Sequence, residues 1–454
     1  MSSGTTGGGT TGNGGGGSGD GGSGGGGSRT LHVPMLARVE GEASMRVVVY
    51  AGRVSEVELR IFEPPRFFEA LLRGRAFTEP PDITARICGI CPVAYQMSAC
   101  QAIEDACGAV VPPPLQDLRR LLYCGEWIES HALHIYLLHA PDFLGYESAI
   151  DLARDRPDLV ERGLRLKKAG NAILTVIGGR SIHPVNVRVG GFYRLPTPGE
   201  LRGLRSTLAD ALADALATVE LVAGFDFPDF THDFEYLSLR PAQGYPIETG
   251  QVVTSGGLAF AAAHFDAHVT EEHVRHSNAL HARLRGTEPY LTGPLARYAL
   301  NSAALSPLAA QAARDAGLGP ACRNPFRSII VRAVEVTYAV EEALRIIDSW
   351  AGAGAPAVTV TPRAGTGYGA TEAPRGLLYH RYRLAADGTI TDARIVPPTS
   401  QNQIGIEHDL RAFVQPRLHL PTDELTRQCE QAIRNYDPCI SCATHFLDLS
   451  VEHR

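Results

Sequence analysis

Apolar and polar positions alternate along the first part of the chain that can build a core. Residues 33–63 follow this two-residue period, are rich in β-branched side chains and are interrupted at Ala51-Gly52. A two-residue period puts the apolar side chains on one face of a strand, and a short Gly-containing interruption suits a hairpin. The pattern predicts an antiparallel sheet at the N-terminal end of the fold.

A helical period of three to four residues replaces the alternation after Pro64-Pro65. It predicts a short helix over 66–74 that ends at Gly74, and it recurs in residues 98–108, 115–140, 201–222, 326–351 and 421–435. Residues 223–265 are richer in aromatics, glycine and aspartate, which is typical of strands and loops, and Asp387-Gly388 predicts a further hairpin. The fold class we expect is α+β: a large, mainly helical bundle with an N-terminal antiparallel sheet and inserted β segments.

Residues 1–28 have a different composition from the rest. They consist almost entirely of glycine, serine and threonine, which bury nothing, so we expect a disordered tail without chemistry. The remaining chain is long enough for two or three domains or for one large body that buries a metal. It contains no apolar run of 18 residues, which predicts no membrane span.

Charge and cysteine content narrow the functional classes. A net charge of −7 without a basic stripe makes nucleic acid an improbable partner. The nine cysteines are an odd number in a long chain, which favours a reduced compartment and metal chemistry over a disulfide framework. The start of the chain also lacks the basic and apolar stretches of a secretory signal, so the predicted location is the cytoplasm.

Two C-x-x-C pairs carry the candidate chemistry. Cys88 and Cys91 lie near the start of the chain, and Cys439 and Cys442 lie near its end. Four thiolates suit zinc, nickel or iron. Such pairs most often bind structural zinc, but the two pairs of a zinc site usually lie within one small module. A redox-active pair would instead follow a strand in a βαβ unit. The other cysteines are expected to be small core residues: Cys100, Cys107, Cys124, Cys322 and Cys429.

The two motifs resemble a known family. R-I-C-G-I-C, ending at Cys91, and D-P-C-I-S-C-A-T-H, ending at His445, are similar to the paired signatures of nickel-iron hydrogenase large subunits, and the resemblance covers residues 30–454. It implies a catalytic domain over residues 29–445 in which all four thiolates bind nickel. Cys91 and Cys442 would also bridge to an iron that carries carbonyl and cyanide ligands.

The resemblance also assigns roles to residues outside the cysteine pairs. Glu40, in an R-x-E-G segment of the first strand, would shuttle protons, although a glutamate on a hairpin is ordinarily solvated. Arg375 would face the open coordination position and hydrogen-bond a cyanide. Thr399 and Ser400 would bind the other cyanide, unless these hydroxyls satisfy the backbone of their own turn. The groups above the metals would be completed by Asp142 and Pro374.

A magnesium site is implied at the end of the chain. Glu69 and His445, with a backbone carbonyl, would hold Mg²⁺, which prefers oxygen ligands. For Glu69 the alternative is a surface charge on a helix. Residues 446–454 would be a tail that a maturation endopeptidase removes after His445, as in the family.

Partners follow from what the chain lacks. Splitting dihydrogen requires a Lewis-acidic metal, a base and an electron exit, and no further cysteine cluster with iron-sulfur spacing is present. An iron-sulfur small subunit is therefore implied, together with nickel chaperones. Tyr95 and Glu42 replace histidines that many members carry, which favours the NAD(P)-linked, sulfhydrogenase-like branch with flavin and iron-sulfur diaphorase subunits. Two alternatives remain open: a zinc-stapled scaffold, and a metal-free homologue in a respiratory complex.

Overall fold

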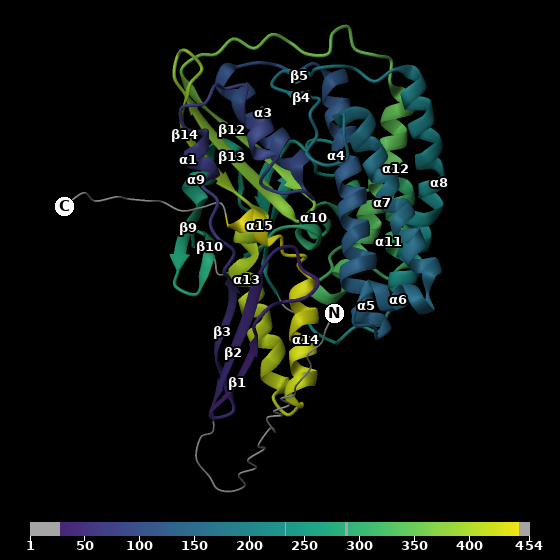
Figure 1. The fold of residues 1–454 in the computed structure, drawn as a ribbon, viewed down its shortest axis with the longest axis vertical. Helices are drawn as coiled ribbons and strands as arrows, with labels where there is room; N and C mark the ends of the chain where they lie inside the picture. Colours follow the sequence, from purple (N-terminus) through teal and green to yellow (C-terminus); the bar gives the residue numbers. More distant parts are fainter. Residues whose placement is uncertain (1–27, 232, 287–288, 445–454) are drawn as a thin grey trace, which may run out of the picture.

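The structure is a computed structural model that describes residues 28–231, 233–286 and 289–444. Two strands of its N-terminal sheet form within the alternating residues 33–63, as predicted, and a third strand precedes that pattern and begins at Ser28, a residue expected in the tail (Figure 1). Ala51 and Gly52, with φ of 49° and 73°, make the turn between the second and third strands. The sheet packs on two C-terminal helices, α13 and α14. Its antiparallel strands, in spatial order, are β1 (Ser28–Val33), β2 (Ala43–Tyr50) and β3 (Arg53–Ile61).

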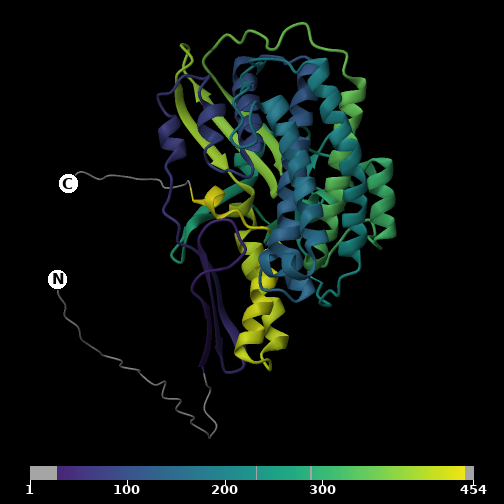
Figure 2. The same ribbon diagram turned by 45° about the vertical axis from the view of Figure 1, so that its right-hand side comes forward.

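Four long helices form the predicted bundle, and they lie side by side in Figures 1 and 2. They are α4 (Pro113–Leu133), α7 (Pro157–Gly178), α8 (Pro198–Ala223) and α12 (Ser328–Ser349). The helix expected over 115–140 continues past Leu133 as a π-helix, and α7 is an addition to the predicted helices. Shorter helices pack around the bundle: η1 (His134–His139), α5 (Ala140–Leu144), α6 (Ala149–Asp155), α10 (Pro294–Asn301) and α11 (Pro307–Asp315).

A second antiparallel sheet supports the first cysteine pair. Helix α3 (Pro92–Cys107) begins directly after Cys91, earlier than the period indicated, and packs on this sheet. The approach is close because Gly367 and Gly369 have no side chain: a Cβ at Gly367 would lie 1.9 Å from the Ala102 carbonyl oxygen. The strands are β12 (Gly365–Ala373), β13 (Gly376–Leu384) and β14 (Ile390–Val396), with the predicted hairpin at Asp387-Gly388 between the last two.

Smaller β segments connect the large parts. A four-stranded sheet has the order β11-β6-β7-β8, in which β11 runs parallel to β6. Its strands are β6 (Glu235–Arg240), β7 (Gln251–Thr254), β8 (Ala259–Phe260) and β11 (Tyr290–Leu291). Two hairpins complete the β structure: β4 (Val187–Arg188) with β5 (Gly191–Phe192), and β9 (Val269–Val274) with β10 (Ser277–Leu284).

The C-terminal helices bring the second cysteine pair to the middle of the molecule (Figure 1). They are α13 (Pro398–Val414), α14 (Thr422–Arg434) and α15 (Ile440–Ala443). The short helices α1 (Phe68–Leu72) and α2 (Pro80–Thr84) pack on β14 and on α3, respectively. The α+β prediction is confirmed. In the described ranges no helix is both long and apolar enough to cross a membrane.

A buried charge network joins the bundle to the second sheet. Arg297 on α10 donates to both carboxylate oxygens of Glu335 at 2.8 Å and to Glu372 at 3.1 Å, and all three side chains are fully buried. The same guanidinium donates to the carbonyls of Ala373 and Pro374. Burial opposes ionisation of Glu335, but Arg297 outweighs it and lowers the pKa of Glu335 to about 2. Arg297 therefore holds the β12–β13 turn in place.

Replacing Arg297 with leucine should lower the free energy of unfolding by about 3–5 kcal/mol, because two buried carboxylates lose their partner. Denaturant unfolding measures the change. The control is Arg205→Leu, since Arg205 pairs with Asp348 at the surface and the pair should be dispensable. Equal stability of the two variants would contradict the importance of the network.

Candidate metal centre

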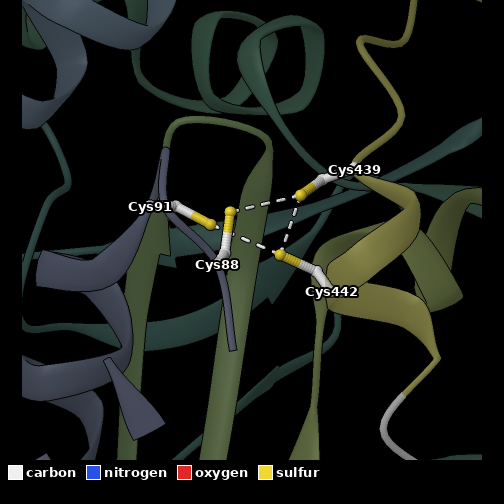
Figure 3. A group of neighbouring side chains, drawn as sticks. All are labelled: Cys88, Cys91, Cys439 and Cys442. Atoms are coloured by element: carbon white, nitrogen blue, oxygen red, sulfur yellow. Dashed lines mark hydrogen bonds between the residues drawn. The ribbon is translucent and has the colours of Figure 1, made fainter. Parts of the chain in front are cut away.

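The four cysteines of the two C-x-x-C pairs converge on one point (Figure 3). Cys88 Sγ lies 3.5 Å from Cys439 Sγ, Cys91 Sγ lies 3.4 Å from Cys442 Sγ, and the sulfurs of Cys439 and Cys442 are 2.9 Å apart. All four side chains are buried, with at most 3% of any residue exposed. The predicted convergence of both ends of the chain is thus present in the fold.

The first pair is fixed at the start of α3. Cys91 is the N-cap residue of this helix, and the Ile90 N–H donates to Cys88 Sγ at 3.2 Å. The first N–H groups of a helix have no partner within the helix. Here Glu126 on α4 accepts from Val93 N at 2.6 Å and from Ala94 N at 3.2 Å. Sequence reasoning missed Glu126, because nothing in its neighbours indicates a capping role from another helix.

The second pair is fixed by the segment that contains Glu40. Ile440 N donates to the backbone carbonyl of Glu40 at 2.9 Å, and Glu40 and Cys439 form an isolated parallel bridge. Thr399 Oγ1, in the first turn of α13, accepts from Cys439 N at 3.1 Å. Its hydroxyl therefore supports the cysteine loop rather than its own turn.

The donor set fits a thiolate-bound metal. Metal–sulfur bonds of about 2.3 Å put neighbouring sulfurs roughly 3.3–3.8 Å apart, near two of the three separations here. Hydrogen bonds from the other three cysteines lower the pKa of the Cys88 thiol, whereas burial raises the pKa of Cys439 and of Cys442. Burial therefore opposes ionisation of all four thiols together, and a bound cation would favour the release of their protons.

Glu40 lies against the cysteines. The Cys439 thiol donates to Glu40 Oε2 at 3.1 Å, and Ser441 N donates to the same oxygen at 3.0 Å. Burial raises the pKa of this carboxyl, and the charge of Cys88 raises it further. Glu40 is half-buried and is not a solvated hairpin residue. It lies in the connection between β1 and β2 rather than in the first strand, since β1 ends at Val33 and Arg38 in this connection has a left-handed φ of 59°.

Arg375 is a buried cation beside the sulfurs. It occupies the β12–β13 turn and donates from Nε to the Asp437 carbonyl at 2.8 Å and from Nη2 to Asp437 Oδ1 at 3.1 Å. Burial opposes its charge, but Asp437, followed by the sulfurs of Cys439, Cys91 and Cys88, raises the pKa of Arg375 above its ordinary value. Its Nη1 is buried and has no hydrogen-bond partner among the described residues.

Three other residues were expected near the metals: Ser400, Pro374 and Asp142. Ser400, next to Thr399, is fully buried, and its Oγ has no partner in the described part of the chain. Pro374 contributes its carbonyl to Arg297 and not to the cysteines. Asp142 is held by Arg38 and Arg434, with Arg434 Nε donating at 2.7 Å. Asp142 thus fastens α5 to α14 and to the Glu40 segment.

The predicted magnesium ligands are only partly described. Glu69 Oε1 accepts from Ile395 N at 2.7 Å, and burial followed by the charge of Glu271 raises the pKa of Glu69 to about 8. It is therefore not a simple surface charge. His445 lies outside the described residues. The backbone carbonyl of the preceding residue, Thr444, accepts from Arg66 N at 2.7 Å. Arg66 lies three positions before Glu69 in the chain.

Two more residues near the site were not assigned a role from the sequence. Asp437 has a left-handed φ of 48° and orients Arg375. Tyr95 is buried on α3, and burial, followed by the charges of Cys442 and Cys91, raises its pKa. The place of Asp437 in D-P-C-I-S-C was a signal that it pairs with a cation, because a carboxylate that flanks a thiolate site needs a positive charge nearby.

Comparisons with known proteins agree with this geometry. The family model described as nickel-dependent hydrogenase matches residues 66–161 and 270–445. The chain belongs to the nickel-dependent hydrogenase family. Sulfhydrogenase 1 subunit alpha of Pyrococcus furiosus is 33% identical over 434 residues, which cover 93% of this chain and 100% of the relative.

Two further relatives of this hydrogenase chain are named as NAD-reducing. The subunit beta of NAD-reducing hydrogenase HoxS from Cupriavidus necator is 28% identical over 92% of this chain and 95% of the relative. A crystal structure of an NAD⁺-reducing [NiFe]-hydrogenase in the H₂-reduced state superimposes with a TM-score of 0.83 at 26% identity, covering 92% of this chain and 99% of that chain.

These findings confirm the expected large catalytic subunit of a nickel-iron hydrogenase. The four-cysteine cluster fits nickel and iron. The zinc-stapled scaffold and the metal-free homologue are not supported. The remaining five cysteines are free thiols away from this cluster, and burial raises the pKa of Cys100, Cys124, Cys322 and Cys429.

Cys439→Ser should abolish stable nickel binding, because one of four converging thiolates is lost. Cys322→Ser is the matched control: Cys322 is also buried, but its Sγ donates to the Asn324 carbonyl at 3.5 Å and lies outside the four-cysteine group. Elemental analysis of the purified variants measures the nickel content. An equal loss of nickel in both variants would indicate general destabilisation and not a lost ligand.

Proposed function

We propose that this subunit splits and forms dihydrogen at the four-cysteine site, with Glu40 as the proton carrier. The observation that carries the proposal is the contact between Glu40 Oε2 and Cys439 Sγ, 3.1 Å apart. When bound, nickel and an iron with carbonyl and cyanide ligands would supply the Lewis acidity that polarises dihydrogen. Cys88 and Cys439 would be terminal ligands, and Cys91 and Cys442 would bridge the two ions.

Glu40 has the properties of a proton carrier. A carboxyl with a raised pKa can accept and release a proton near neutral pH, and it must lie within hydrogen-bond reach of the donor. Glu40 meets both conditions, since burial raises its pKa and the Cys439 thiol donates to it. Its second hydrogen bond, from Ser441 N, holds the carboxylate in place.

Arg375, Thr399 and Ser400 would surround the diatomic ligands. Arg375 keeps a buried donor, Nη1, without a partner in the described chain, and Ser400 keeps a buried hydroxyl in the same condition. Buried polar atoms are nearly always hydrogen-bonded, so both atoms are suited to ligands such as cyanide. Infrared bands of carbonyl and cyanide that shift in Arg375→Lys would test this assignment. Asp142 and Pro374 would act indirectly, by fixing the Glu40 segment and the Arg375 turn.

Magnesium would bind at Glu69. Its carboxylate is half-buried, burial raises its pKa to about 8 despite the hydrogen bond from Ile395 N, and the carbonyl of Thr444, the last described residue, accepts from Arg66 N. His445 would complete the site once residues 446–454 are removed by a maturation endopeptidase. Intact-mass analysis of the active protein tests the removal, and magnesium analysis of Glu69→Gln tests the ligand.

An iron-sulfur small subunit would dock where the first cysteine pair meets the surface. Gly89, between the two buried cysteines, is exposed, and a Cβ there would lie 4.0 Å from Ile182 Cγ2. Ile182 is 56% exposed, Val185 44% and Tyr193 57%, so large apolar side chains are exposed along this segment. Exposed apolar side chains in one region are typical of a protein interface. Electrons would leave the site along this short path.

The further partners follow from the relatives. Two of them are named as NAD-reducing, which supports electron transfer through flavin and iron-sulfur diaphorase-type subunits to NAD(P). Nickel chaperones would load the site, and the complex would operate in the cytoplasm. Hydrogen-dependent reduction of NADP⁺ and of NAD⁺ by the purified complex measures the acceptor.

Glu40→Gln should slow the exchange between dihydrogen and solvent protons by at least about 100-fold, because the amide cannot carry the proton. The metals should still load, since glutamine keeps an oxygen for Ser441 N. The control is Glu58→Gln, whose carboxylate pairs with Arg46 and Arg60 on the N-terminal sheet. Exchange at the wild-type rate in Glu40→Gln would remove its proposed role.

Ile182→Glu should release the iron-sulfur subunit, because it puts a charge into the apolar interface. Co-purification measures the association, and retained nickel shows that the large subunit is folded. Ile150→Glu is the control, since Ile150 is 71% exposed on α6, at the other end of the bundle from β4 and β5 (Figure 1). Undiminished association of Ile182→Glu would place the interface elsewhere.

A further inference from the structure

A second group of metal-binding side chains lies away from the cysteines. One ligand atom from each of His276, His281 and Glu407 lies within 4.8 Å of the other two. His276 Nε2 and Glu407 Oε1 are 2.8 Å apart, and the rings of His276 and His281 meet edge to face with centroids 5.4 Å apart. Two imidazoles and one carboxylate form a donor set for a divalent transition metal.

Three separate elements deliver these residues. His276 lies in the turn between β9 and β10, His281 lies on β10, and Glu407 lies on α13. Glu407 Oε1 also accepts from Leu59 N of β3 at 2.9 Å, so the carboxylate already joins α13 to the N-terminal sheet. A metal here would fasten the hairpin, the sheet and α13 at one point.

His281 provides the observation that an ordinary ion pair does not explain. It is only 2% exposed, and its Nε2 is buried without a hydrogen-bond partner among the described residues. Buried polar atoms are rarely left in this state. Burial lowers the pKa of His281, which keeps the ring neutral, as a metal ligand must be.

His276 and Glu407 are partly exposed to solvent. Their side chains are 19% and 16% exposed, so solvent reaches this side of the group. Ligand atoms bound to one metal at about 2.0–2.2 Å lie roughly 3 Å apart, which the His276–Glu407 separation already matches. Glu407 Oε2 makes no hydrogen bond within the described chain and remains a second possible donor.

This group is distinct from the proposed magnesium position. Successive residues of a strand point to opposite faces. His281 stands opposite Glu272 in the β9–β10 register, whereas Glu271, the neighbour that influences Glu69, stands opposite Ala282. His281 and Glu271 therefore lie on opposite faces of the hairpin.

We propose that His276, His281 and Glu407 bind one zinc-class divalent ion that stabilises the contact of the β9–β10 hairpin with α13. Water would complete the coordination on the exposed side. The ion would have a structural role, because the first turn of α13 carries Thr399, whose hydroxyl holds Cys439 N. This ion would be additional to the metals of the hydrogenase site, and its binding does not depend on the proposed hydrogenase activity.

Zinc titration of the purified full-length complex tests the proposal. After treatment with a weak chelator, the wild type should bind one more equivalent of Zn²⁺ than His281→Asn or Glu407→Gln, and Zn²⁺ should raise its melting temperature but not theirs. Any residual affinity of the variants should be weaker by at least about 10- to 100-fold. Glutamine at 407 keeps an oxygen for Leu59 N, so this variant should fold normally.

The control is His273→Asn, which removes an exposed histidine of β9 from the same hairpin. It should keep the additional equivalent. Equal zinc binding by the wild type, His281→Asn and Glu407→Gln would overturn the proposal, as would an equal loss in His273→Asn. Nickel content and hydrogen uptake, measured on the same samples, report separately on the hydrogenase site.

Discussion

Four buried sulfurs that converge on one point are the constraint on which the rest of the structure depends. Cys88 and Cys91 come from one end of the folded chain and Cys439 and Cys442 from the other, and their thiols shift one another's pKa in opposite directions. Such a group cannot hold four negative charges without cations. Two neighbouring residues act on the sulfurs in different ways. Glu126 holds Cys91 in place through the first turn of α3, and Arg375 supplies positive charge.

The countercharge is held by a relay of buried hydrogen bonds. Arg297 binds Glu335 and Glu372 within the core and, through the carbonyl of Pro374, fixes the turn that presents Arg375. Arg375 then binds Asp437, two residues before Cys439. The helical bundle thereby positions a guanidinium beside the sulfurs, although no bundle helix provides a cysteine ligand.

The sequence predicted the elements whose pattern is local. Alternation gave the N-terminal sheet, and the helical period gave most bundle helices, because each pattern depends on neighbouring residues alone. The cysteines and Glu40 were found through motifs. Glu126 and Asp437 were not assigned, because their roles exist only after distant segments meet. Glu126 on α4 accepts from the first turn of α3, and Asp437 accepts from Arg375, which lies more than sixty positions earlier in the chain. Asp142, expected among the groups above the metals, pairs with Arg38 and Arg434, and these contacts could not be read from local sequence either.

X-ray absorption at the nickel edge of the purified protein tests the convergence of the sulfurs most directly. The account predicts one nickel per chain with four sulfur neighbours at about 2.3 Å and an iron atom close by. Nickel bound mainly by nitrogen and oxygen, or a sulfur site that contains zinc alone, would contradict it.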